Sequence, residues 1–186
     1  LRTTSVEAMQ KHLTRIGLGT FVDPRYGGGK INERTTEDMV ELMPIGGEEY
    51  LFYKAFPIHV GIVRGTTADP DGNITMEREA LTLEGLAIAM AARNSGGIVI
   101  VQVERIAERG SLNPRQVKIP GVLVDCVVVA EAENHAQTYG TPYSHAFSGR
   151  QRVPMNRISP LELDERKVIA RRCAFELPPG GVVNLG

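Results

Sequence analysis

The chain has 186 residues, enough for one domain or for one domain and part of a second. Its 21 basic and 22 acidic residues nearly cancel, which argues against a nucleic-acid partner. No apolar stretch is long enough to cross a bilayer, no secretory signal is visible, and two distant cysteines do not form a disulfide framework. These features predict a cytoplasmic protein without a membrane partner. Because the chain starts at Leu1 and ends at Gly186 directly after an apolar run, we expect both ends to be truncated.

The first stretch with a clear pattern, residues 4–15, has apolar side chains at helical spacing and predicts a short amphipathic helix. The glycine-rich stretch 17–30 that follows is predicted to be a flexible loop. A dinucleotide fingerprint fails there because position 22 is valine, and a P-loop fails because position 24 is proline and position 31 is isoleucine. A plain connector and a functional loop with exposed backbone N–H groups both remain open.

Residues 35–56 predict strands and turns. Two short apolar runs, at 39–43 and 50–53, flank the turn signal Gly46-Gly47.

Residues 58–104 predict a right-handed βαβ crossover. An apolar run at 58–64, a helical pattern at 80–94 and a second apolar run at 98–103 follow one another, and the last suits a central parallel strand. Ligands of such sheets bind beyond the carboxyl ends of the strands. The loop 65–73 leaves that end of the first strand, and Gln102 lies at the same end of the second strand.

The loop 65–73 superficially resembles a calcium loop. An EF-hand counted from Asp69 requires glycine at its sixth position and glutamate at its twelfth, where this chain has Ile74 and Ala80. Calcium is therefore rejected, and turn formation is the favoured role of Asp71 and Asn73. For Thr66, Thr67 and Asp69, which lie nearer the strand end, turn and ligand roles remain equally open.

Several polar residues elsewhere invite a functional interpretation. We expect His59 to be a satisfied polar residue, and Glu104 to pair with Arg105 or another base. Asp125, in a strand predicted at 122–130, should have a structural partner, with catalysis as the alternative. Cys126 is predicted to be a small buried hydrophobe.

Residues 131–160 are polar and aperiodic, and we interpret them as leaving one domain and crossing to the next. His135 and His145 are assigned to a surface loop rather than to a metal site, because no cysteine or carboxylate accompanies them at metal-site spacing. A capping box at 159–162, with Asp164 as a competing N-cap, predicts a helix that reaches Leu177. A new strand is predicted from residue 182.

Eight stretches, taken together and in order, resemble the family I CoA-transferases, of the acetate/propionate type, which are similar to succinyl- and acetoacetate-CoA transferases. These stretches are 17–25, 28–30, 64–69, 71–73, 92–97, 120–125, 165–172 and 183–186.

The resemblance implies an α/β fold with a mostly parallel sheet and helices on both faces. It also implies that residues 1–145 are the later part of a first domain, 146–160 a crossing segment and 161–186 the start of a second domain. Members of this family exchange coenzyme A between an acyl-CoA and a free carboxylate. They do so through a glutamate that becomes a mixed anhydride and then a glutamyl-CoA thioester.

No residue of this chain matches that glutamate, which is expected beyond Gly186, and the family's glycine-rich oxyanion segment would precede Leu1. The segment alone is therefore expected to be inactive, without a metal or a permanently bound cofactor. Its expected partners are an acyl-CoA thioester, a short-chain carboxylate and further copies of itself in a homo-oligomer.

Strand-end position and resemblance together give eight substrate-cleft candidates: Gly17, Gly19, Thr20, Phe21, Thr66, Thr67, Asp69 and Gln102. Two alternatives remain. One is a non-catalytic module that binds an acyl or phosphorylated ligand, and the other is a sugar-phosphate isomerase of related fold.

Overall fold

The computed structural model describes residues 12–183, and the chain divides into two compact units, residues 1–150 and 151–186. Two separate apolar cores lie within the first unit. We describe the sheets of this unit one at a time, followed by the second unit.

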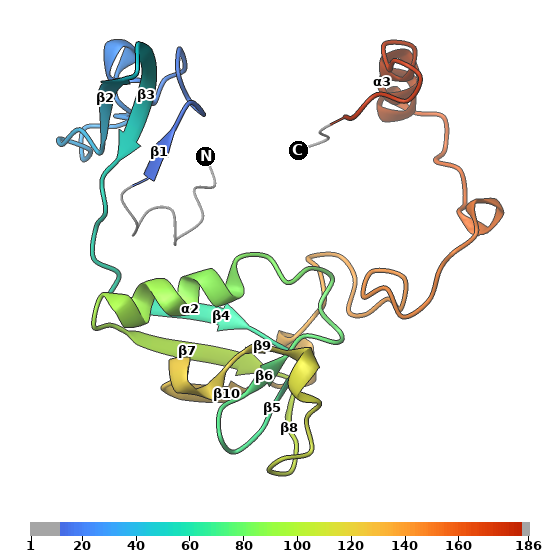
Figure 1. Ribbon diagram of the computed structural model, residues 1–186. Helices are drawn as coiled ribbons and strands as arrows, with labels where there is room; N and C mark the ends of the chain where they lie inside the picture. Colours follow the sequence, from blue (N-terminus) through green and yellow to red (C-terminus); the bar gives the residue numbers. More distant parts are fainter. Residues whose placement is uncertain (1–11, 184–186) are drawn as a thin grey trace. The chain divides into compact units, whose positions relative to one another are not determined.

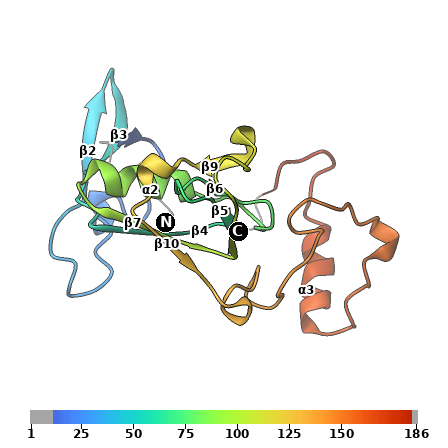
Figure 2. The same ribbon diagram turned by 90° about the horizontal axis from the view of Figure 1, so that it is seen from below.

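An antiparallel sheet in the order β1-β3-β2 forms from β1 (His12–Thr14), β2 (Val40–Ile45) and β3 (Glu48–Tyr53). Gly46 and Gly47 both have positive φ and make the tight turn between β2 and β3, which confirms the predicted strands and turn (Figure 2). The helix predicted over 4–15 is wrong for residues 12–14, because these pair with β3 as a strand. The rest of that prediction lies outside the described residues.

A parallel sheet in the order β10-β7-β4 confirms the predicted crossover. Its strands are β4 (Val60–Arg64), β7 (Ile98–Val103) and β10 (Cys126–Val129), and α2 (Gly85–Asn94) connects the first two (Figure 1). The central position predicted for residues 98–103 is confirmed, as is the α/β class. The helix begins at Gly85 rather than at residue 80, because Leu83 has a φ of 45°, outside the helical region.

Within the described residues, a helix covers one face of this sheet. Gly61 permits a close approach of α2, since a Cβ there would lie 3.1 Å from the Cβ of Ala92. On the same face Val99, Val101 and Val103 are fully buried. The opposite face is more open, and Ile62 there is 71% exposed.

A third sheet, with four strands, includes residues of the loop predicted at 65–73. In the order β8-β5-β6-β9 it comprises β8 (Arg105–Ile106), β5 (Thr67–Ala68), β6 (Ile74–Thr75) and β9 (Val117–Ile119). Short 3₁₀ turns occur at η1 (Pro24–Tyr26), η2 (Pro114–Gln116), η3 (Gly121–Leu123), η4 (Ala132–Asn134) and η5 (Met155–Arg157).

The strand predicted at 122–130 is shorter than expected. Its first residues form η3, because Gly121 packs against the backbone of residues 71 and 72 and donates its N–H to the Asn73 side chain at 3.0 Å. Pairing with β7 begins only at Cys126.

The second unit contains α3 (Glu165–Ala174), which is capped by Asp164. The Asp164 carboxylate accepts the Lys167 backbone N–H at 2.8 Å, so the competing N-cap is correct and the capping box at 159–162 is wrong. The helix ends at Ala174 and does not reach Leu177. Residues 182 and 183 are not in a strand, and the rest of the predicted strand lies outside the described residues. Between residues 12 and 183, no helix is long and apolar enough to cross a membrane.

Candidate functional site

The carboxyl ends of β4 and β7 carry a polar site that the residues after β10 complete. Arg64 ends β4 and lies in register with Gln102 of β7. Arg64 donates through Nη1 to the Ala136 carbonyl at 2.6 Å, and Gln102 donates through Nε2 to the Asn134 carbonyl at 2.9 Å. Residues 131–145, which we call the covering segment, are thereby held over the strand ends.

Gln137 also anchors the covering segment, through two side-chain hydrogen bonds. Its side-chain Nε2 donates to the Arg78 carbonyl at 2.7 Å, and its Oε1 accepts the Ser144 backbone N–H at 2.7 Å. Gln137 is buried, and its two partners are half-buried, so both bonds are partly shielded from water. The interpretation of residues 131–160 as leaving the domain did not include this return by residues 131–145, because its anchors are scattered polar side chains without periodicity.

A buried histidine and a buried glutamate meet beneath the covering segment. The side chains of His135 and Glu79 are 4% and 9% exposed, with Nε2 and Oε1 3.5 Å apart. Glu79 Oε2 lies 2.9 Å from Arg64 Nε. Neither nitrogen reaches a hydrogen bond of ordinary geometry, so both contacts are electrostatic rather than well-formed hydrogen bonds. The prediction that His135 lies in a surface loop is wrong.

A cavity of about 190 Å³ opens beside this pair. Its lining residues are Arg64, Arg78, Glu79, Glu104, Ala132, His135, Gln137, Pro142 and Tyr143. The Arg78 guanidinium lies 3.7 Å from the centre of the Tyr143 ring, a cation–π contact, and its Nε is 2.9 Å from Glu104. Each arginine of the lining thus has a carboxylate partner.

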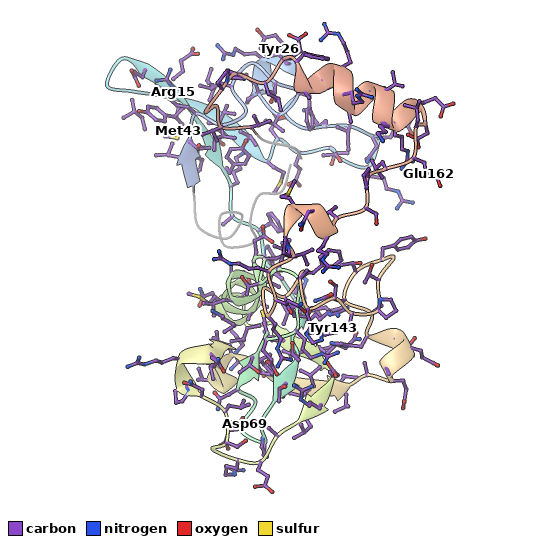
Figure 3. The ribbon with its side chains drawn as sticks, turned by 90° about the vertical axis from the view of Figure 1, so that its right-hand side faces the viewer. Arg15, Tyr26, Met43, Asp69, Tyr143 and Glu162 are labelled. Carbon is purple, nitrogen blue, oxygen red and sulfur yellow. The ribbon has the colours of Figure 1, made fainter. Side chains whose placement is uncertain are left out.

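Among the sequence-predicted candidates, Gln102 lies at this site, while Thr66, Thr67 and Asp69 do not line the cavity. Thr66 and Thr67 are buried; the Thr66 hydroxyl accepts the Arg78 backbone N–H, and the Thr67 hydroxyl donates to Glu77 at 2.6 Å. Both hydroxyl groups therefore form hydrogen bonds within the fold. In Figure 3, Asp69 stands well apart from Tyr143 of the cavity.

Asp69 organises its own turn. Its carboxylate accepts backbone N–H groups from Asp71 and Asn73 and the Asn73 side-chain amide, at 2.9 to 3.0 Å. Burial raises the pKa of the Asp69 carboxyl, but these hydrogen bonds outweigh it and leave the pKa below its ordinary value. The turn role expected for Asp71 and Asn73 is confirmed.

The glycine-rich loop is ordered around a residue that the sequence interpretation missed, the buried Asp23. Its carboxylate accepts the Gly19 N–H at 2.9 Å and the Arg25 guanidinium at 2.8 Å. The Arg25 hydrogen bond first, and then that of Gly19, hold the pKa of the Asp23 carboxyl well below its usual range. An acidic residue followed by proline, an N-cap signal for η1, could have revealed it.

The loop candidates have mainly internal contacts. A Cβ at Gly17, whose φ is +97°, would lie 2.6 Å from a Val22 methyl group, and the Thr20 hydroxyl donates to the Gly17 carbonyl. Phe21 is half exposed and lines a largely apolar cavity of about 350 Å³ together with Gly28 and Gly29.

The other polar predictions have mixed outcomes. Asp125 pairs with Arg93 at 2.6 Å and accepts the Val99 N–H at 2.8 Å, which confirms a structural partner. Glu104 pairs with Arg105 at 3.2 Å as well as with Arg78. Cys126 is exposed rather than buried, because its register with Ile100 and Ile62 places it on the open face of the sheet. His59 and His145 are exposed.

Over the described range 12–183, no group of three or more histidine, cysteine, aspartate or glutamate side chains could hold an ion.

Comparison with known proteins gives consistent matches. The sequence model of the coenzyme A transferase family matches residues 8–130. Caffeate CoA-transferase of Acetobacterium woodii is 59% identical over 175 residues, which cover 94% of this chain and 33% of that protein. Acetate CoA-transferase YdiF of Escherichia coli K12 is 43% identical, with the same coverage.

Solved structures agree with these matches. The acyl-CoA transferase YdiF of Escherichia coli O157:H7, in a thioester complex with CoA, superposes with a TM-score of 0.79 at 40% identity. The match covers 94% of this chain and 32% of that one. This chain therefore spans about a third of the length of the curated relatives it matches.

Proposed function

This chain belongs to the coenzyme A transferase family, and from that premise we propose that the full-length protein moves coenzyme A from an acyl-CoA to a free carboxylic acid. The observation that carries the proposal is the 59% identity to a caffeate CoA-transferase across 94% of the chain. Coenzyme A enters as a thioester substrate and leaves as one, so the reaction needs no permanently bound cofactor. The protein is proposed to work in the cytoplasm as a homo-oligomer.

The chemistry is assigned to a glutamate outside this chain, beyond Gly186. Its carboxylate would attack the thioester carbonyl and release the CoA thiolate, giving a mixed anhydride. Attack of the thiolate on the glutamyl carbonyl would then give glutamyl-CoA and free acid, and the acceptor carboxylate would reverse both steps. This chain supplies the scaffold and the cleft loops, and its own carboxylates Glu79, Glu104 and Asp125 already pair with arginines.

The domain assignment follows the same proposal: residues 1–145 belong to the first transferase domain, 146–160 cross over, and 161–186 begin the second. The division of the chain after Arg150, inside the proposed crossing, supports this assignment. We assign Gln102 to the cleft because it lies at the carboxyl end of the central strand. Phe21 is assigned to it because it presents an exposed aromatic ring beside a cavity.

Two classes of acceptor acid are supported by different relatives. A short-chain aliphatic carboxylate is supported by the 43% identity to an acetate CoA-transferase, and a phenylacrylate by the 59% identity to the caffeate enzyme. A phenylacrylate carries an aromatic ring that a short-chain aliphatic carboxylate lacks, so its binding site needs a larger apolar surface. Competition between the two acids for one enzyme would decide between them.

The test is an exchange assay on the full-length protein. Acetyl-CoA is offered with labelled propionate or with caffeate, and formation of the new thioester is followed by chromatography. We expect exchange at a rate that saturates with the concentration of acetyl-CoA and with that of the acceptor acid. Residues 1–186 alone should show no exchange. Hydrolysis of acetyl-CoA without thioester exchange, or binding without turnover, would refute the proposal in favour of a hydrolase or a binding module.

A further inference from the structure

We propose that the cavity beside His135 binds a neutral carbonyl group, with His135 Nε2–H as the donor, and that its ligand is the amide-bearing pantetheine arm of coenzyme A. The inference rests on the proposed function for the identity of the ligand. The preference for a neutral group that both donates and accepts hydrogen bonds rests on the structure alone.

The ring proton of His135 is fixed by its neighbour Gln102. The Gln102 amide nitrogen contacts the Asn134 carbonyl at 2.9 Å and His135 Nδ1 at 3.2 Å. A carbonyl can only accept, so the contact with Asn134 sets the orientation of the amide and makes its nitrogen the donor to Nδ1. Nδ1 is then an acceptor, and the proton of the neutral imidazole must be on Nε2.

That Nε2–H group is buried without a hydrogen-bond partner. The His135 side chain is 4% exposed, and the only carboxylate that we find near Nε2 among the described residues, that of Glu79, is 3.5 Å away in poor geometry. Buried donors without a hydrogen bond are rare because they lose their bonds to water, and the contact with Glu79 at 3.5 Å replaces that loss only in part. A ligand oxygen in the adjoining cavity would supply the missing acceptor.

The charges of the lining favour a neutral ligand over an anion. Arg64 and Arg78 each lie 2.9 Å from a carboxylate, Glu79 and Glu104 respectively, so the lining has no net charge. A bound carboxylate would face both glutamates or displace one of them. An amide carries an acceptor for His135 and a donor for either glutamate, and the Tyr143 ring offers an apolar wall for the methylene groups.

Size and position are consistent with part of a long ligand. A volume of about 190 Å³ is below the range of pockets that enclose a whole small molecule, so a segment of the arm would enter it. The cavity is at the carboxyl ends of parallel strands, where ligands of such sheets bind.

The test measures pantetheine binding to the full-length protein by calorimetry. His135→Phe keeps a planar ring but removes the donor, and we expect the dissociation constant to rise about tenfold, as loss of one hydrogen bond to a buried group would predict. His59→Phe makes the same change at an exposed histidine and should leave binding unchanged. Circular dichroism and thermal melting establish that both variants are folded.

Glu79→Gln provides a second, independent measurement. If the site takes a neutral amide, acetate should not compete with pantetheine in either the wild type or this variant. If it is an anion site, removal of the Glu79 charge should strengthen acetate binding and make acetate displace pantetheine, which would overturn the assignment. Unchanged pantetheine affinity in folded His135→Phe that still exchanges CoA would overturn it too, whereas absence of exchange in the wild type would refute the proposed function instead.

Discussion

Gln137→Leu should release the covering segment without unfolding the sheet beneath it. The substitution preserves approximate size and removes both side-chain bonds, to the Arg78 carbonyl and from the Ser144 N–H. Arg64 and Gln102 still hold residues 134–136, so the loosening should be partial and local.

The expected magnitude follows from the two bonds. Each bond contributes on the order of 1 kcal/mol net. Each half-buried partner that is left unpaired adds a penalty of about 1 to 3 kcal/mol, which solvent contact and apolar burial of the leucine offset in part. A local destabilisation of about 2 to 4 kcal/mol is therefore expected. Because about 1.4 kcal/mol corresponds to a factor of ten, hydrogen exchange in the covering segment should accelerate by roughly 30- to 700-fold.

Hydrogen exchange with mass spectrometry of the full-length protein measures this directly. Peptides covering 131–145 report on the segment, and peptides covering β7 report on the core. Gln116→Leu, the same change at an exposed glutamine, is the matched control and should exchange like the wild type. Equal exchange of the segment in both variants, or equal acceleration of segment and β7, would refute the proposed anchoring.

Three further predictions concern other parts of the fold. The pKa of Asp23 is lowered on folding, so its contribution to stability is complete above the ordinary carboxyl pKa of about 3.9 and is lost as pH falls below it. Thermal melts between pH 6 and pH 3 should therefore show a smaller fall in melting temperature for Asp23→Asn than for the wild type. Gly61→Val places methyl groups against α2 and should reduce the free energy of unfolding in urea by about 1 to 3 kcal/mol, whereas Gly140→Val, with open space around it, should change it little. Asp125→Ala removes the acceptor of the Val99 N–H and the partner of Arg93 and should cost about 1 to 2 kcal/mol, while Asp125→Asn, which keeps an acceptor, should cost less.

Patterns with strong periodicity or clear turn chemistry predicted the fold well. The central βαβ unit followed from two apolar runs and a helical pattern, and the turn at Gly46-Gly47 from its glycine pair. Boundaries failed where tertiary contacts overrode local preference. Because Gly121 is held by residues 71–73, β10 begins later in the chain than predicted. Leu83 has a positive φ, so α2 also begins later than predicted.

The candidate site was predicted only in part. Strand-end position identified Gln102, because topology alone places that residue at the ligand edge. His135 and Gln137 were missed because burial of a polar residue in an aperiodic segment leaves no pattern in the sequence. Their places depend on contacts with Glu79 and Arg78, which lie more than fifty residues earlier in the chain.

We propose that this chain shapes the cleft of a CoA-transferase whose nucleophile lies beyond Gly186. The most direct measurement incubates the full-length protein with acetyl-CoA, reduces it with borohydride, and locates the modified residue by peptide mass spectrometry. We predict loss of activity and one reduced glutamate beyond Gly186, with residues 1–186 unmodified. A reduced carboxylate within residues 1–186, or steady CoA exchange without any trapped adduct, would contradict the claim.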